Sequence, residues 1–279
     1  MTARTPLYEA ANTARYERQQ LIREYQEAYA CRLVVMRDAI FGRCVPFFEE
    51  TVFDADPEQD LHVMLDTPGG DGETALRLVR QAQSRCRELT VIVPNQAKSA
   101  GTMFVLGAHR VYMGPTSDLG PVDPQFLLPN GSLAAARAII AAVEEAERRI
   151  QQHPTTYAFH AALLSDITAL MVQQARDAMD RTGDLIQEAL ASVRSRSSDQ
   201  VEALAKNLRQ HLIGEPKDHG AIVSASDAKR YGLPVEEADP KSDRWKAVWR
   251  LWTKYLVIGS DYVYEGELAS QVADLPTSS

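Results

Sequence analysis

Cysteine is scarce in this chain, and the cysteines that occur follow no metal-binding spacing. Cys31, Cys44 and Cys86 are the only three among 279 residues. None belongs to a Cys-x-x-Cys pair or stands at zinc-ligand spacing from a histidine. An odd number of cysteines also fits no simple disulfide framework. We therefore expect reduced thiols in a cytoplasmic protein without a metal site.

Long apolar segments and clusters of basic residues are also missing. No apolar run approaches the roughly 18 residues of a membrane-spanning helix, and the polar N-terminus holds no apolar signal segment. The formal net charge is -8, and an acidic surface repels phosphate groups. No strand is followed by Gly-x-Gly-x-x-Gly, which argues against nicotinamide binding. We expect neither a membrane span nor a nucleic-acid partner.

What the sequence does contain is a repeated strand–turn–helix pattern. Short apolar runs predict strands at 32–36, 61–67, 89–94 and 110–115. Apolar residues at helical spacing predict helices at 73–85 and 99–109, and mostly helix at 133–152 and about 160–212. This alternation implies an α/β fold with a parallel sheet and right-handed crossovers.

The same pattern suggests three parts along the chain. We expect a helical extension at 1–30, a main α/β domain at 31–238 with a helical insertion at about 133–212, and a helical tail at 239–279. The tail holds all three tryptophans, at spacings of four and three that place them on one helix face: Trp245, Trp249 and Trp252. This stripe favours packing against the domain or against a second subunit.

A glycine turn between a predicted strand and helix is the first element that suggests chemistry. It reads Asp66-Thr67-Pro68-Gly69-Gly70-Asp71-Gly72. Adjacent glycines permit positive φ and close approach of another backbone. Free N–H groups at the start of a helix can stabilise an oxyanion. A plain connection between strand and helix would use the same residues.

A serine at a second strand-to-helix turn is the next element. Ser99 lies in Lys98-Ser99-Ala100-Gly101-Thr102, before a stretch of small and apolar residues. On such a turn the Oγ atom is exposed, and the following N–H points to where an oxyanion forms. The alternative is an ordinary helix-capping serine.

The order and spacing of three motifs resemble those of the Clp-fold serine peptidases. TPGG at 67–70 is followed by SAGT at 99–102 and by MGPTSDLGPVDPQ at 113–125. They are similar to motifs of signal peptide peptidase A and of the serine dehydrogenase proteinase family, and SASDAKRYGLPVE at 224–236 resembles the end of the Clp catalytic domain. The resemblance, over about 10–236, implies a Clp/crotonase-type spiral of ββα units with a parallel sheet and added helices.

The resemblance also implies roles for individual residues. The SAGT serine of such enzymes is the nucleophile, which is Ser99 here. The second glycine of the turn and the residue after the serine supply oxyanion N–H groups, which are Gly70 and Ala100. The Clp histidine aligns near Val122 and Asp123, where this chain has no histidine.

The identity of the general base therefore stays open, and the candidates are His219, Lys217 and Lys98. Signal peptide peptidase A uses a lysine, but none occurs here in the corresponding stretch after the serine. His219 precedes the segment that brings the third Clp triad member to the serine, so it is the predicted base, with Asp123 or Asp218 orienting its ring. The Lys98 side chain is expected to point away from the adjacent serine.

Function is then predicted as peptide hydrolysis through a serine acyl-enzyme, a reaction that needs no cofactor. Two alternatives stay open. A crotonase-like enzyme would use the same oxyanion device on acyl-CoA thioesters without a serine nucleophile. A non-catalytic oligomeric scaffold would explain the missing histidine at 122–123. We expect a peptide or protein substrate and a homo-oligomer.

Overall fold

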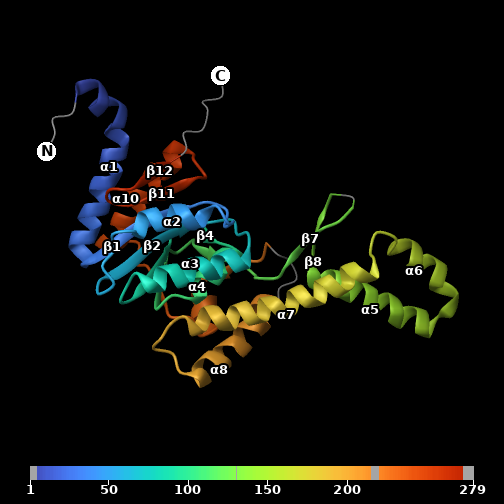
Figure 1. The fold of residues 1–279 in the computed structure, drawn as a ribbon. Coiled ribbons are helices and arrows are strands. Elements are labelled where there is room, and N and C mark those ends of the chain that lie inside the picture. The colour runs from blue at the N-terminus through green and yellow to red at the C-terminus, as the bar shows by residue number, and fades with distance from the viewer. Residues whose placement is uncertain (1–4, 130, 215–219, 273–279) are drawn as a thin grey trace.

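A seven-stranded sheet forms the centre of the protein. The computed structural model describes residues 5–129, 131–214 and 220–272. Within them the strands follow the order β10-β5-β3-β2-β1-β11-β12 (Figure 1). The first five are parallel to one another, and β11 and β12 are added antiparallel. The strands are β1 (Cys31–Arg37), β2 (Asp60–Asp66), β3 (Leu89–Val93), β5 (Arg110–Met113), β10 (Val235–Glu237), β11 (Val263–Glu265) and β12 (Ser270–Val272).

Helices cover both faces of the sheet, which explains why its central strands are mostly apolar. Leu33 and Val35 of β1 face one layer of helices, whereas Val34 and Met36 face the other. The first layer contains α1 (Pro6–Tyr29) and α10 (Asp243–Ile258). The second layer contains α2 (Cys44–Val52), α3 (Gly72–Ser84), α4 (Ala100–Leu106), α7 (Ala169–Ala191) and α8 (Ser198–Arg209).

A small second sheet brings the conspicuous motifs of the sequence together. It has the order β4-β6-β9, with β4 parallel and β9 antiparallel to β6. Its strands are β4 (Gln96–Ala97), β6 (Asp118–Leu119) and β9 (Val223–Ser224), and α9 (Ala225–Arg230) follows β9. The serine turn, the 113–125 motif and the 224–236 motif therefore meet in one place. The architecture is the predicted α/β spiral of ββα units.

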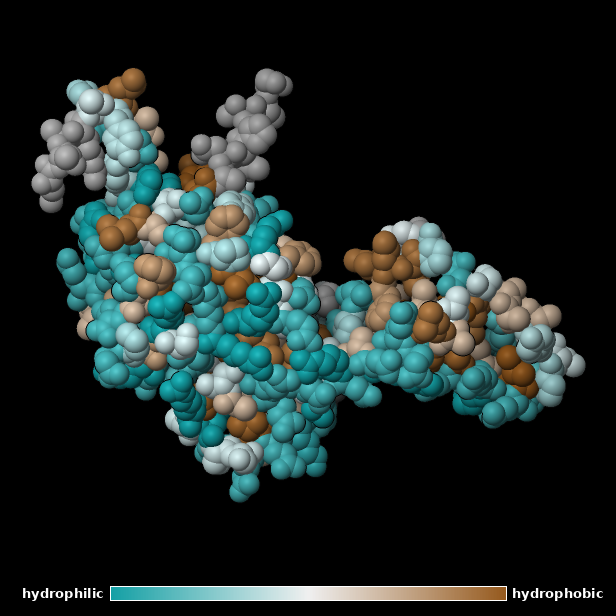
Figure 2. All heavy atoms as spheres, in the orientation of Figure 1, coloured by the Kyte–Doolittle hydropathy of each residue, from teal (hydrophilic) through white to brown (hydrophobic). Residues whose placement is uncertain are grey.

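An arm of helices and a hairpin extends from the body of the molecule (Figure 1). We use the name "arm" for β7 (Gln125–Leu127), β8 (Leu133–Ala135), α5 (Ala136–Gln152), a 3₁₀ turn (Pro154–Thr156), α6 (Tyr157–Leu163) and the start of α7. Helix α7 continues from the arm into the body, where it packs against α3 and α4. Figure 2 shows apolar side chains gathered on the arm, and the exposed ones include Leu127, Leu133, Tyr157, Phe159, Leu163 and Leu170.

Most predicted elements are present, and three differ. The four predicted strands and the helix at 73–85 are confirmed to within two residues of their ends. Residues 133–135 form a strand rather than the start of a helix, and α2 lies where no element was predicted. The tail is not wholly helical, because β11 and β12 join the main sheet. These strands have three residues each, too short to show a clear alternation of polar and apolar positions.

The tryptophan stripe lies on α10 and packs mainly inside the protein. Trp245 and Trp252 are buried, whereas Trp249 is 43% exposed. Among the described residues, no helix is both long and apolar enough to cross a membrane. The division into an extension, a catalytic domain and a tail stays a prediction.

Candidate active site

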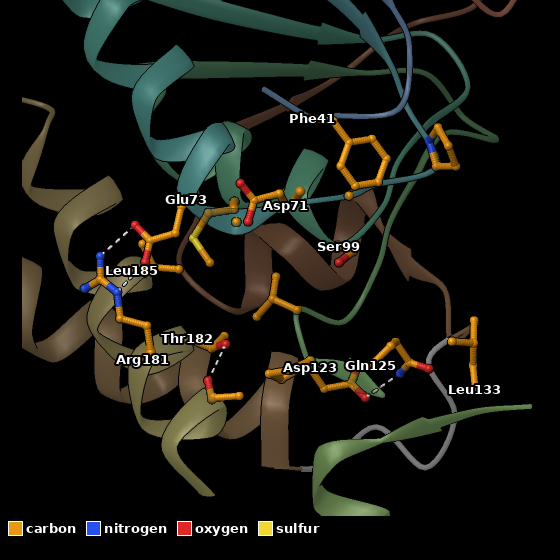
Figure 3. Close-up of a pocket in the computed structure, with 18 residues that line it drawn as sticks. Phe41, Asp71, Glu73, Ser99, Asp123, Gln125, Leu133, Arg181, Thr182 and Leu185 are labelled. Atoms are coloured by element: carbon orange, nitrogen blue, oxygen red, sulfur yellow. Dashed lines mark hydrogen bonds and ion pairs between the residues drawn. The ribbon is translucent and has the colours of Figure 1, made fainter. Parts of the chain in front are cut away.

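Ser99 occupies a strained position between β4 and α4. Its φ of 47° and ψ of -111° place it in a region that L-residues rarely adopt. The only other described non-glycine residue at positive φ is Ala30. Ser99 stands at the N-cap position, but its side chain makes no capping hydrogen bond. The helix-capping alternative therefore does not explain the residue, and its Oγ is left directed into a cavity (Figure 3).

The glycine turn packs directly against the serine turn. Thr67 pairs with Ala97, with Lys98 N–H donating to the Thr67 carbonyl at 3.1 Å. A Cβ built on Gly69 would lie 2.8 Å from the Cβ of Ser99, so a glycine is required for this approach. Two turns that are separate in the sequence thus form one surface.

The predicted oxyanion donors belong to that surface. Gly70 has a φ of 146°, a value suited to glycine, and Ala100 is the first residue of α4. Both line the cavity that Ser99 faces. Within the described part of the chain, neither backbone N–H has a protein acceptor. Two N–H groups beside a serine hydroxyl are the donor set that a tetrahedral oxyanion needs.

The cavity has a volume of about 540 Å³ and mixed walls. Apolar side chains come from several elements: Phe41, Met103, Val122, Leu133 and Leu185. One wall carries a charged pair, in which Arg181 of α7 binds Glu73 of α3 through two hydrogen bonds of 2.6 and 2.9 Å. Figure 3 shows this pair at one end of the cavity and Leu133 at the other.

Asp123 lines the same cavity across from Ser99 (Figure 3). Its residue is only 2% exposed, and its carboxylate accepts a hydrogen bond of 3.3 Å from the Gln125 side chain. The fold therefore brings together Ser99, Gly70, Ala100 and Asp123, all four of which were predicted to belong to one site.

Of the three candidate bases, the structure describes only Lys98. His219 and Lys217, together with Asp218, lie outside the described residues. Lys98 points away from Ser99, as expected: its ammonium group binds the Asp118 carboxylate and donates to the Leu119 carbonyl at 3.4 Å.

The five described histidines do not line the cavity. His62, which we interpreted as structural, is buried under α1 and hydrogen-bonded through Nδ1 to the Tyr25 hydroxyl at 3.0 Å. Burial, assisted by the positive charge of Arg244, lowers its pKa to about 4. His109 accepts a backbone hydrogen bond from Leu89 at 3.0 Å. These contacts indicate structural roles.

Sequence reasoning missed the cavity wall that α7 provides. This helix was predicted only as part of an insertion, yet it contributes three residues to the cavity: Arg181, Thr182 and Leu185. Arg181 and its partner Glu73 are 108 residues apart, so no local pattern signals the pair. In the described part of the chain, no group of three or more His, Cys, Asp or Glu side chains could hold a metal ion.

A spiral α/β fold in which a serine without a capping role faces a cavity, beside two N–H groups that no described residue accepts from, belongs to the ClpP-like class of serine peptidases. Within that class, residues 51–245 match the family model of the ClpP-like SDH-type serine proteinases. The match spans more than half of the chain, and the protein belongs to this family.

Individual relatives are more distant. An uncharacterized protein of Methanocaldococcus jannaschii is 26% identical over 187 residues, which is 67% of this chain and 57% of the relative. A membrane-bound protease of Pyrococcus horikoshii is 31% identical over 90 residues, or 31% of this chain and 20% of the relative. The solved structure of a mutant membrane-bound stomatin-specific protease aligns with a TM-score of 0.46 and 16% identity, covering 76% of this chain and 81% of that one. The chain thus spans less than two thirds of the first of these relatives.

Proposed function

We propose that the protein is a serine peptidase that cleaves peptide bonds through an acyl-enzyme on Ser99. The observation that carries the proposal is the position of this serine. It lies at positive φ, caps no helix, and faces a cavity of about 540 Å³ that Gly70 and Ala100 also line. Family membership supports a peptide or protein substrate. The apolar part of the cavity favours an apolar side chain next to the scissile bond.

The reaction would proceed in two steps. Ser99 Oγ forms a bond to the carbonyl carbon, and its proton passes to the base. The oxyanion that results accepts hydrogen bonds from the N–H groups of Gly70 and Ala100. The carbon–nitrogen bond then breaks, and the leaving amine takes the proton from the base. Water next attacks the carbonyl carbon of the acyl-enzyme, and the base removes a proton from that water. The bond between this carbon and Ser99 Oγ then breaks, the base returns the proton to Oγ, and the acid product leaves.

We propose His219 as the base and Asp123 as the residue that orients it. The described residues on either side of 215–219 support this proposal. Leu212 accepts a backbone hydrogen bond of 3.1 Å from Val122, and Val223 pairs with Leu119. The described residues that flank 215–219 in the sequence thus lie beside the loop that carries Asp123. A neutral imidazole has the proton affinity that a serine hydroxyl requires near pH 7.

Labelling with a fluorophosphonate, read by intact mass, tests the proposal. Such a reagent phosphonylates an activated serine, so the wild-type protein should gain one adduct that peptide mapping assigns to Ser99. Ser99→Ala should gain none and should also fail to cleave a library of quenched fluorescent peptides. An unlabelled and inactive wild-type protein would exclude the serine peptidase. Turnover of an acyl-CoA thioester by Ser99→Ala would favour the crotonase-like alternative.

A further inference from the structure

The loop between β1 and α2, residues 38–43, lies directly behind the predicted oxyanion turn. Ile40 N–H donates to the Gly69 carbonyl at 2.8 Å, and Asp71 N–H donates to the Ile40 carbonyl at 2.7 Å. A Cβ built on Gly70 would lie 2.1 Å from the carbonyl oxygen of Ile40, so the two backbones are in close contact. The direction of the Gly70 N–H is therefore set by where the Ile40 peptide lies.

A buried carboxylate holds this loop. Asp38 is 3% exposed and accepts a hydrogen bond of 2.9 Å from the Tyr264 hydroxyl. Arg43, at the other end of the loop, donates to the same carboxylate at 2.7 and 3.3 Å. Hydrogen bonds to an ionised group are stronger than neutral ones. Asp38 thus ties both ends of the loop together and anchors them to a residue 226 positions away.

Tyr264 is itself held rigidly. It lies on β11, opposite Met36 in the antiparallel pairing with β1, and it is fully buried. The ring of Phe47 lies 5.5 Å from its ring. The hydroxyl of Tyr264 therefore has a fixed position to which the Asp38 carboxylate is anchored.

These anchoring residues fall outside the stretch that the family model matches. The model covers residues 51–245, which include the glycine turn but neither the 38–43 loop nor Tyr264. Family membership therefore does not assign a role to them.

We propose that Asp38 and Tyr264 are positioning residues for the oxyanion turn. Neither lines the cavity that Ser99 faces, and both act through the Ile40 peptide on the N–H of Gly70. The inference rests on the proposed function, in which that N–H stabilises the oxyanion. An oxyanion donor works at about 2.7–3.1 Å, and misplacement of a catalytic group by about 1 Å can cost roughly 100-fold in rate. A small shift of the loop is therefore enough to slow the chemical step.

Tyr264→Phe tests the proposal most directly, because it removes the hydroxyl and keeps the buried ring. We expect kcat on a quenched fluorescent peptide to fall about 10-fold. KM should stay nearly unchanged, because the oxyanion forms only after the substrate has bound. The rate of fluorophosphonate labelling should fall by a similar factor. Asp38→Ala should lower kcat further, and Asp38→Asn, which keeps an acceptor oxygen, should recover part of the loss.

The matched control is Tyr262→Phe. Tyr262 lies two residues away on the same segment, and its hydroxyl makes no hydrogen bond to a described residue, so kcat should stay at the wild-type value. All variants are compared at a temperature at which circular dichroism shows them folded. Wild-type kcat in both Tyr264→Phe and Asp38→Ala, or a rise in KM alone, would overturn the inference. If the wild-type protein itself is neither labelled nor active, the proposed function has failed, and that result is distinct from a loss confined to these variants.

Discussion

Gly69 and Ser99 touch across the two turns that form the candidate site. A Cβ on Gly69 would come within 2.8 Å of the Ser99 Cβ and 3.0 Å of the Lys98 carbonyl oxygen. The glycine therefore provides the space in which Ser99 adopts its positive φ of 47°. Strained backbone of this kind is typical of residues whose side chain must be presented to a substrate.

The strain at Ser99 predicts a difference between two inactive variants. Both Ser99→Ala and Ser99→Gly lose the hydroxyl and should lose peptidase activity. Only glycine accepts φ 47° and ψ -111° without steric cost. Strain at such positions costs on the order of 1–3 kcal/mol, part of which is offset by the greater flexibility of unfolded glycine. Ser99→Gly should therefore be more stable than Ser99→Ala by about 1 kcal/mol in urea unfolding. Equal stability would show that the position is not strained.

Gly70→Ala should disable the oxyanion turn. The new methyl group would meet the Ile40 carbonyl oxygen at 2.1 Å, so the backbone of the turn must shift. Loss of one oxyanion donor typically costs about 100- to 1000-fold in kcat. Gly266→Ala is the matched control, because a Cβ there lies no closer than 3.6 Å to another atom and Gly266 does not line the cavity. If Gly70→Ala turned over peptides at close to the wild-type rate, the Gly70 N–H would not be an oxyanion donor.

The proposed base predicts how activity depends on pH. If His219 accepts the proton of Ser99, kcat/KM should rise through an apparent pKa of about 6–7, because only the neutral imidazole is a base. His219→Ala should abolish most of kcat and leave the melting temperature nearly unchanged, whereas Lys217→Ala should do little. If kcat/KM instead rose at clearly higher pH and His219→Ala were fully active, the general base would be a lysine.

A separate pH effect is expected on stability. Burial beside Arg244 lowers the pKa of His62 from 6.5 to about 4, so the folded protein disfavours its protonated form. The contribution to stability is fully present above pH 6.5 and is lost as the pH falls from 6.5 to 4, because the unfolded chain then binds the proton first. It amounts to about 3 kcal/mol in total. His62→Gln cannot titrate, so its free energy of unfolding should fall less over this range than that of the wild-type protein. If the free energies of unfolding of the two proteins fell in parallel between pH 6.5 and 4, the pKa of His62 would not be lowered in the folded protein.

Oligomerisation is predicted from the exposed apolar residues of the arm. Phe159 and Leu163 of α6 are each 63% exposed, whereas Trp249 of α10 is 43% exposed. Light scattering should give a mass above the 30.9 kDa of one chain. The double change Phe159→Glu with Leu163→Glu should reduce the mass to that of a monomer, and Trp249→Glu should not. The opposite result would place the interface on α10, and a monomeric wild-type protein would contradict the prediction altogether.

The sequence by itself determined the α/β fold class and marked Ser99, which the resemblance of three motifs then identified as the nucleophile candidate. Both depend on local signals: apolar runs that form buried strands, glycines that permit a tight turn, and a serine at a strand-to-helix junction. The joint position of Gly70, Ser99 and Ala100 was implied by the resemblance to the Clp-fold peptidases. It has a physical reason, because the turns at the carboxyl ends of neighbouring parallel strands lie at the same edge of a sheet.

Only the tertiary structure decided what surrounds those residues. The Arg181–Glu73 wall joins helices 108 residues apart, and the Tyr264–Asp38 hydrogen bond joins segments 226 residues apart. Neither pair leaves a periodic pattern, because each depends on a single side chain meeting another after the sheet has formed. The three-residue strands β11 and β12 were missed for a related reason: their pairing with β1, rather than their own composition, makes them strands. Local sequence therefore specifies the turns of the site, and long-range packing specifies its walls and supports.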